Sequence, residues 1–227
     1  GHLSLIAWPN GLALILATLL PMLIFSQHLP WSALAQGSVI WWALLAALLM
    51  LMRPSRLPEA AAWQRTVSAM AIFPVLLPAL LFSLSLQQRA PRFLLWVILI
   101  ISVDDVSAMI FGKIWGRHPL VPRISPGKTW EGLLGGLLAS AIMGTLGAWM
   151  LVGAAVSSLR SGAVLGLITG IFAVLGDLAE SFLKRRANCK DSGQLLPGHG
   201  GLLDRLDSMS AGIPVFVAGL YYLGWWK

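Results

Sequence analysis

The acidic residues of this chain are spaced in a way that could bind cations. All nine except Glu59 lie at or beyond residue 104. Asp177 and Glu180 are three residues apart, so they share one face of a predicted helix. Asp204 and Asp207 repeat that spacing on the next predicted helix. Two such pairs facing each other would offer an oxygen cage for a hard divalent cation such as Mg²⁺. The alternative is structural ion pairing with nearby basic side chains, namely Lys184, Arg185 and Arg205.

Two further carboxylates, Asp104 and Asp105, are adjacent in the sequence. Neighbouring residues on a helix point about 100° apart, so the two side chains cannot face one partner equally. We therefore predict one functional acid, with the other capping a helix or meeting a basic side chain.

A basic, glycine- and proline-containing loop follows these aspartates, in the sequence GKIWGRHPLVPRISPGKTWEG. Its three prolines forbid a continuous helix. The stretch Ser125-Pro-Gly-Lys-Thr129 places backbone donors, hydroxyls and an ammonium just before the next predicted helix, which is a favourable anion site. It is not a Walker A loop, because Pro122 stands where that motif needs Gly and no strand is predicted before it. The alternative is a membrane-surface loop that contacts lipid phosphates.

A second loop, LLPGHGGLLDR, surrounds His199 with glycines. The glycines and Pro197 predict a tight, ordered turn in which the backbone can approach a ligand closely. The chain has no His/Cys cluster with zinc spacing and no nucleophile elbow, so nothing indicates a covalent nucleophile.

The elements that carry these residues are predicted to be membrane helices. Of the 227 residues, 57% are hydrophobic and only 11% are charged, and mean hydropathy is +0.79. A soluble core could not bury this much apolar surface. The expected fold is all-α, a polytopic integral membrane protein of about seven transmembrane helices, some kinked or interrupted. The predicted spans are 4–26, 37–52, 67–86, 93–112, 131–152, 161–183 and 206–226. The first span lacks a basic flank and a clear cleavage site, so it is not expected to be a signal peptide.

Glycines recur along the fifth and sixth predicted spans, which favours close contact between these helices in lipid. They are Gly135, Gly136, Gly144 and Gly147, then Gly162, Gly166 and Gly170.

The distribution of basic residues predicts the orientation. Twelve of the sixteen Lys and Arg residues fall on one side of the seven spans and four on the other. This bias predicts an external N-terminus and cytoplasmic loops at 113–130 and 184–205. The net charge of +7 then reflects basic loops facing lipid headgroups or a phosphorylated substrate, rather than nucleic acid. The single Cys189 excludes an internal disulfide.

The segment from Ser181 to Asp207 resembles the signature of the phosphatidate cytidylyltransferases, also called CDP-diacylglycerol synthases. The resemblance covers 27 positions without a gap. Its fixed residues are Ser181, Lys184-Arg185, Lys190-Asp191, Gly193, Leu196-Pro197, His199-Gly200-Gly201, Asp204-Arg205 and Asp207. Upstream, VPRISPGKTWEG resembles a second family block, so the resemblance spans roughly 93–227, a catalytic transmembrane region that follows N-terminal helices in 1–92.

The chain departs from the family where other members read Ala-Asp-Ser/Thr-Gly-Ala-Tyr. In the sequence from Asp104 to Met109, Asp105 aligns with the family Asp, but the Gly and the Tyr are lost. This departure leaves open a paralogue with a different lipid acceptor, or a catalytically silent lipid-binding one.

The resemblance implies that CTP and phosphatidic acid react to give CDP-diacylglycerol and pyrophosphate. It also implies Mg²⁺, with a second cation left open, a homodimer, and a bacterial inner-membrane protein whose active site faces the cytoplasm. Asp177 and Asp204 are the implied metal ligands, and we add Glu180 and Asp207 in support. The predicted catalytic residues are Asp177, Asp204, Lys190, Asp191 and Asp207. The predicted substrate-binding residues are Asp105, Ser125, Gly127, Lys128, Thr129, Lys184, Arg185, His199, Gly200, Gly201 and Arg205.

Two other functions are consistent with parts of the pattern. A related CTP-dependent enzyme, such as a lipid-alcohol kinase, is disfavoured by the long match between Lys184 and Asp207. A transporter with an acidic ion pathway is disfavoured because the acidic groups lie close to basic loops suited to phosphates.

Overall fold

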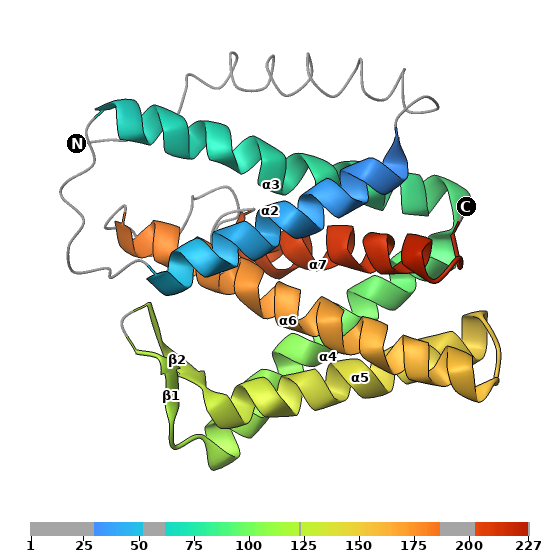
Figure 1. The fold of residues 1–227 in the computed structure, drawn as a ribbon. Coiled ribbons are helices and arrows are strands. Elements are labelled where there is room, and N and C mark those ends of the chain that lie inside the picture. The colour runs from blue at the N-terminus through green and yellow to red at the C-terminus, as the bar shows by residue number, and fades with distance from the viewer. Residues whose placement is uncertain (1–29, 52–61, 123, 187–202, 227) are drawn as a thin grey trace. The chain divides into compact units, whose positions relative to one another are not determined.

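The computed structural model describes residues 30–51, 62–122, 124–186 and 203–226. These residues form six helices and one two-stranded antiparallel sheet (Figure 1). The helices are α2 (Trp31–Leu51), α3 (Ala62–Arg89), α4 (Pro91–Trp115), α5 (Trp130–Leu151), α6 (Val156–Arg186) and α7 (Leu203–Tyr222). The strands are β1 (Pro119–Val121) and β2 (Ser125–Thr129).

The chain divides into two compact units, residues 1–33 and 34–227, and the site described below lies wholly in the second. Within that unit, α4 packs against α5, α5 against α6 and α6 against α7, while α3 packs on α7. Six of the predicted spans coincide with α2 to α7, and the predicted span 4–26 lies outside the described residues. The helical character of the fold is confirmed.

Among the described residues, three helices are long and apolar enough to cross a membrane, namely α4, α5 and α6 up to Phe182. The prediction of seven spans is not confirmed by this criterion. The first two turns of α7 include Asp204, Arg205 and Asp207, and these charges lower its mean hydropathy.

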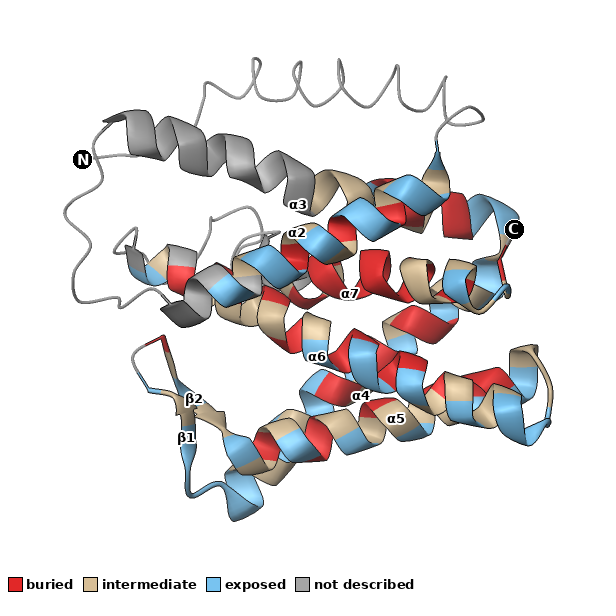
Figure 2. Cartoon of the chain, in the orientation of Figure 1, coloured by how far each residue is buried: buried red, intermediate tan, exposed pale blue. Residues whose placement is uncertain are grey.

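The burial of α5 is inverted relative to a helix of a soluble protein. Its buried positions are Gly, Ala and Ser, while large apolar side chains such as Leu134, Leu138 and Ile142 are more than half exposed (Figure 2). Small residues at helix contacts and large apolar residues facing outward are typical of helices in lipid. This pattern supports a membrane protein independently of overall composition.

The glycines of α5 and α6 bring these two helices into close contact, as predicted. A Cβ atom added to Gly144 would collide with the carbonyl oxygen of Gly162, and one added to Gly166 would collide with that of Ser140. Backbones can approach this closely only where side chains are absent. We call this glycine-lined contact the α5–α6 seam. It fixes α6, which carries Asp177, relative to α5 and to the hairpin that precedes α5.

The segment 113–130, predicted to be a loop, is more ordered than expected. Residues 113–115 complete α4, which ends before the first proline, and β1 and β2 then form a hairpin. Pro119 pairs with Thr129 and Val121 with Ser125. The all-α prediction is therefore wrong at this segment.

Candidate active site

A cavity of about 360 Å³ lies where α4, β2, α5, α6 and α7 meet. Its polar lining comes from four of these elements and its apolar lining from α4, β1, α5 and α6. The polar side chains are Asp105, Lys128, Thr129, Asp177, Asp207 and Ser208. Gly127 and Gly132 also line it, together with the apolar residues Ala108, Met109, Leu120, Leu133 and Val174. A cavity lined by both charged and apolar side chains suits a ligand that is itself amphipathic.

The hairpin is fixed at its base by contacts with the start of α5. Trp130 N–H donates to the carbonyl of His118 at 3.0 Å, and His118 Nδ1 lies 2.6 Å from Glu131 Oε1. The His118 backbone N–H also donates to Glu131 Oε2 at 3.3 Å. Thr129 caps α5, because its Oγ1 accepts from Gly132 N–H at 3.2 Å. These contacts hold Lys128, which lies between them and the tip of the hairpin.

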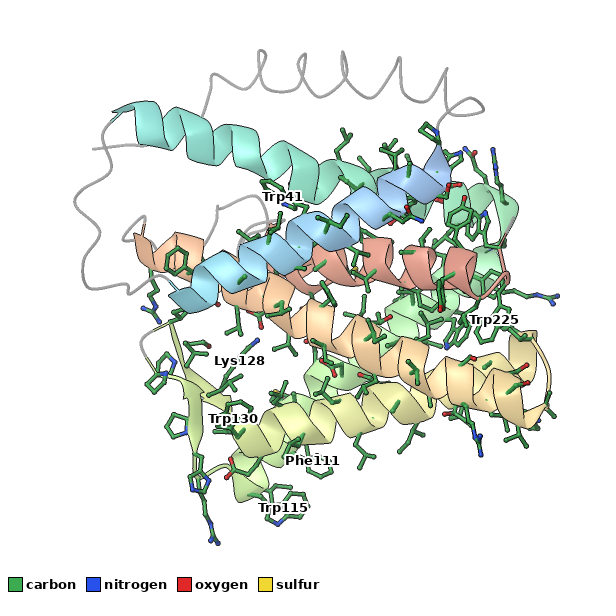
Figure 3. All side chains as sticks on the ribbon, in the orientation of Figure 1. Trp41, Phe111, Trp115, Lys128, Trp130 and Trp225 are labelled. Atoms are coloured by element: carbon green, nitrogen blue, oxygen red, sulfur yellow. The ribbon has the colours of Figure 1, made fainter. Side chains whose placement is uncertain are left out.

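The tip of the hairpin is attached to α6. Arg185 Nε donates to the carbonyl of Ile124 at 3.2 Å, and Ile124 is buried. Both ends of β2 are therefore tied to helices, and Lys128 extends from β2 toward α6 (Figure 3).

Lys128 and Asp177 form the central ion pair of the cavity. Lys128 Nζ lies 2.5 Å from Asp177 Oδ2, and both side chains are about a quarter exposed. The other carboxylate oxygen, Asp177 Oδ1, accepts from Ser181 Oγ at 3.3 Å. Lys128 is 49 residues away in the sequence, so the fold brings the predicted anion-binding loop to the predicted cation-binding helix.

Three carboxylates form a compact cluster beside this pair. One oxygen from each of Asp177, Glu180 and Asp207 lies within 4.8 Å of the others. Lys184 Nζ is 3.0 Å from Glu180 Oε2, so the alternative of structural ion pairing holds for that contact. Oxygen donors from two helices at this spacing match the ligand preference of Mg²⁺, and the ammonium of Lys128 already occupies a cation position against Asp177. The donor set therefore fits a divalent cation.

Asp104 and Asp105 have different surroundings, as their adjacency predicts. Asp105 lines the cavity, and its Oδ1 is 3.5 Å from Ser208 Oγ on α7. Asp104 is fully buried and accepts from Ser140 Oγ at 2.7 Å. The expectation that the second acid meets a basic side chain or caps a helix is wrong, because its partner is a hydroxyl inside the bundle.

Some of the predicted site residues line the cavity and others do not. Asp105, Gly127, Lys128, Thr129, Asp177 and Asp207 line it, and Glu180 belongs to the carboxylate cluster. Ser125, Lys184 and Arg185 are not among its lining residues. Lys190, Asp191, His199, Gly200, Gly201 and the side chains of Asp204 and Arg205 lie outside the described residues.

Several lining residues were not predicted. Ser208 directly follows the predicted site residue Asp207 on the same helix turn. Its polar side chain could therefore have been predicted to lie near the site. Met109 lies four residues after Asp105, hence on the same side of α4. Leu133 and Val174 carry no signal of their own, because apolar residues are expected throughout these helices.

Comparison with known proteins identifies the family. The family model described as "Cytidylyltransferase family" matches residues 3–223. This chain belongs to that family. It is 37% identical over 214 residues to a protein of Pseudomonas aeruginosa named phosphatidate cytidylyltransferase, covering 92% of this chain and 77% of the relative. Relatives of the same name in Haemophilus influenzae and Helicobacter pylori are 34% and 37% identical. Those two alignments cover 85% and 86% of this chain, and 69% and 71% of the relatives.

For a cytidylyltransferase family member, the cavity has an appropriate chemical character. Its ammonium and backbone donors suit phosphates, its carboxylates suit cations, and its apolar wall suits an uncharged part of a substrate. The resemblance stated from the sequence is confirmed at the level of the family.

Proposed function

We propose that this chain is a phosphatidate cytidylyltransferase, which transfers the cytidylyl group of CTP to phosphatidate and releases pyrophosphate. The observation that carries the proposal is the placement of Lys128 against Asp177, beside Glu180 and Asp207, in one amphipathic cavity. The names of the relatives support the choice of both substrates.

The reaction brings two polyanions together, which sets the task of the site. An oxygen of the phosphatidate phosphate attacks the α-phosphorus of CTP, a new P–O bond forms, and the bond to pyrophosphate breaks. A phosphate monoester is already anionic at pH 7, so no general base is needed. Mg²⁺ held by Asp177 and Asp207, with Glu180 and Asp204, would supply charge neutralisation for the attacking and leaving oxygens.

The hairpin supplies the phosphate-binding groups in this proposal. Lys128 offers an ammonium, and Gly127 and Thr129 flank it on the cavity wall. Apart from the chain neighbours of Gly127, no described residue lies within 4 Å of the position that a Cβ would take there, so a phosphate can approach the backbone. The apolar wall formed by Met109, Leu133 and Val174 would contact the glycerol end of the lipid.

We propose the remaining arrangement from the sequence pattern. The chain has seven spans, with an external N-terminus and the loops 113–130 and 184–205 in the cytoplasm, where CTP is present. It lies in a bacterial inner membrane as a homodimer. Lys190, Asp191 and His199 complete the site from the second loop, with Lys184 and Arg185 beside it at the end of α6 and Arg205 at the start of α7.

The test is a direct assay of the purified protein in detergent. Radiolabelled CTP is offered with phosphatidate and Mg²⁺, and labelled lipid is separated by thin-layer chromatography. The proposal expects labelled CDP-diacylglycerol from [α-³²P]CTP and none from [γ-³²P]CTP. A parallel arm offers a lipid alcohol in place of phosphatidate. Label transferred from the γ-position to that alcohol would identify a kinase and overturn the proposal.

A further inference from the structure

Asp104 is an acidic residue for which the proposed reaction has no use. It lies on α4 with none of its surface exposed, and its Oδ1 accepts a hydrogen bond from Ser140 Oγ on α5. Its Oδ2 is also buried and has no hydrogen-bond partner in the part of the chain that the structure describes. Carboxyl groups within a membrane helix are costly to insert and are retained where they serve a purpose.

Glycines of α5 and α6 form a slot around this carboxyl group. A Cβ added to Gly136 would lie 3.0 Å from Asp104 Oδ1, and one added to Gly170 would lie 2.9 Å from the same oxygen. The Gly170 position is also 2.7 Å from Ser140 Oγ. Any residue other than Gly would press on the carboxyl group, so the carboxyl group itself fills the slot. This leaves no space for a cation at Oδ1.

The neighbouring residue faces the cavity. Asp105 lines it and lies 3.5 Å from Ser208 of α7, whereas Asp104 points between α5 and α6. Successive residues on a helix are separated by about 100°, so fixing the direction of one side chain fixes that of the next. Met109, four residues beyond Asp105, follows it to the cavity wall.

The polar contact of the neighbouring residue, from Ser208 Oγ to Asp105 Oδ1, is long at 3.5 Å. The following residues Val106 and Ile110 are apolar, each at least 44% exposed, and neither lines the cavity. Apolar side chains in lipid give little preference for one rotation over another, whereas a hydrogen bond in a close-fitting slot gives one.

We infer that Asp104 is a positioning residue. Its carboxyl group fills the Gly136–Gly170 slot and accepts from Ser140, and this contact sets the rotation of α4 so that Asp105 and Met109 face the cavity. The consequence for catalysis rests on the proposed function, but the rotation itself does not.

The rotation is tested by thiol accessibility, which requires no enzymatic activity. In a Cys189→Ser background, single thiols are introduced by Met109→Cys, on the cavity wall, or by Ile110→Cys, which is exposed but does not line the cavity. A water-soluble cationic thiol reagent reacts only with thiolate that water reaches. We expect the thiol at position 109 to react about tenfold faster than that at 110, because only the first lines the polar cavity, which the reagent can enter in water.

Adding Asp104→Ala should bring the two reaction rates to within about twofold, since α4 then loses the hydrogen bond that sets its rotation. Asp104→Asn retains the size and an accepting oxygen, so it should keep the tenfold ratio. Ser140→Ala, which removes the donor and leaves the carboxyl group in place, should reduce the ratio as Asp104→Ala does. Gly162→Ala is the control, because it disturbs the same α5–α6 seam at Ala148 and Gly144, away from Asp104. It should leave the ratio unchanged.

A ratio that stays at tenfold in both Asp104→Ala and Ser140→Ala would overturn the inference. If Asp104→Ala does not give folded protein, judged by gel filtration in detergent, Ser140→Ala and Asp104→Asn still decide it.

In the assay of the proposed reaction, Asp104→Ala should lower kcat about tenfold and Asp104→Asn should restore it, with little change in KM for CTP. Absence of activity in the wild-type protein would contradict the proposed function while leaving the accessibility result valid.

Discussion

Lys128 Nζ lies 2.5 Å from Asp177 Oδ2, so the cation of the hairpin neutralises the carboxylate of α6. Each residue is predicted to bind a different ligand, a phosphate for Lys128 and a divalent cation for Asp177. Neither residue can bind its own ligand fully while the ion pair between them is intact. A ligand that binds one residue breaks the pair and leaves the other residue available. The phosphate and the divalent cation should therefore bind with positive coupling.

The first prediction concerns this coupling. Lys128→Met, which keeps the length of the side chain and removes the charge, should raise the affinity of the CTP-free protein for Mn²⁺ about tenfold, within the usual range for coupled ligands. It should also raise KM for CTP. Mn²⁺ binding is measured by electron paramagnetic resonance of the free ion, with Lys113→Met as the control, since Lys113 does not line the cavity. Unchanged Mn²⁺ affinity in Lys128→Met would show that the pair does not compete with the cation.

The second prediction concerns the carboxylate cluster. Asp177→Asn and Asp207→Asn should each lower kcat about 10²- to 10³-fold, because each removes charge that the reaction needs at the phosphates. Glu180→Gln should have a smaller effect, since Glu180 is not among the residues that line the cavity. The measurement is the initial rate of CDP-lipid formation at saturating CTP over a range of Mg²⁺ concentrations. Near wild-type rates in both Asp variants would remove the metal-ligand assignment.

Sequence reasoning located the helices because runs of about 20 apolar residues have few other uses. It also placed Lys128 and Asp177 in one site, since both lie at the ends of spans predicted to face the same side. It could not find the hairpin: Ser125-Pro126-Gly127 has the composition of a loop, and its strand conformation comes with its pairing to β1.

The rotation of each helix about its axis could not be predicted from the sequence either. Asp104 and Asp105 are the same residue type at adjacent positions, and only the packing of α4 against Gly136 and Gly170 distinguishes them. The apolar cavity wall was missed for a related reason. Where nearly every helix position is apolar, polarity cannot distinguish a residue that lines a cavity from one that faces lipid.

The third prediction concerns the base of the hairpin. Glu131 holds both the ring and the backbone N–H of His118, and so closes the hairpin that carries Lys128. Glu131→Ala should raise KM for CTP about twofold to fivefold with a smaller change in kcat, because Lys128 is then less well positioned before CTP binds. Glu131→Gln, which can still accept from the His118 backbone, should have an intermediate effect. The measurement is the initial rate as a function of CTP concentration for the three proteins. Equal KM values in all of them would mean that the hairpin is held by its other contacts.

The fourth prediction concerns the glycine seam between α5 and α6. Gly144 has no room for a methyl group, because a Cβ there would meet the Gly162 carbonyl and the backbone of Gly166. Gly144→Ala should therefore destabilise the protein by about 1–3 kcal/mol, the usual cost of overpacking a close contact. The matched control is Gly37→Ala on α2, where no described residue beyond the adjacent helix backbone lies within 4 Å of the added Cβ. That change should be neutral or slightly stabilising, since Ala favours helix over Gly. Thermal unfolding in detergent, followed by tryptophan fluorescence, compares the two variants directly. Equal unfolding temperatures for them would show that the seam tolerates a methyl group and that α5 and α6 are less closely packed than their glycines indicate.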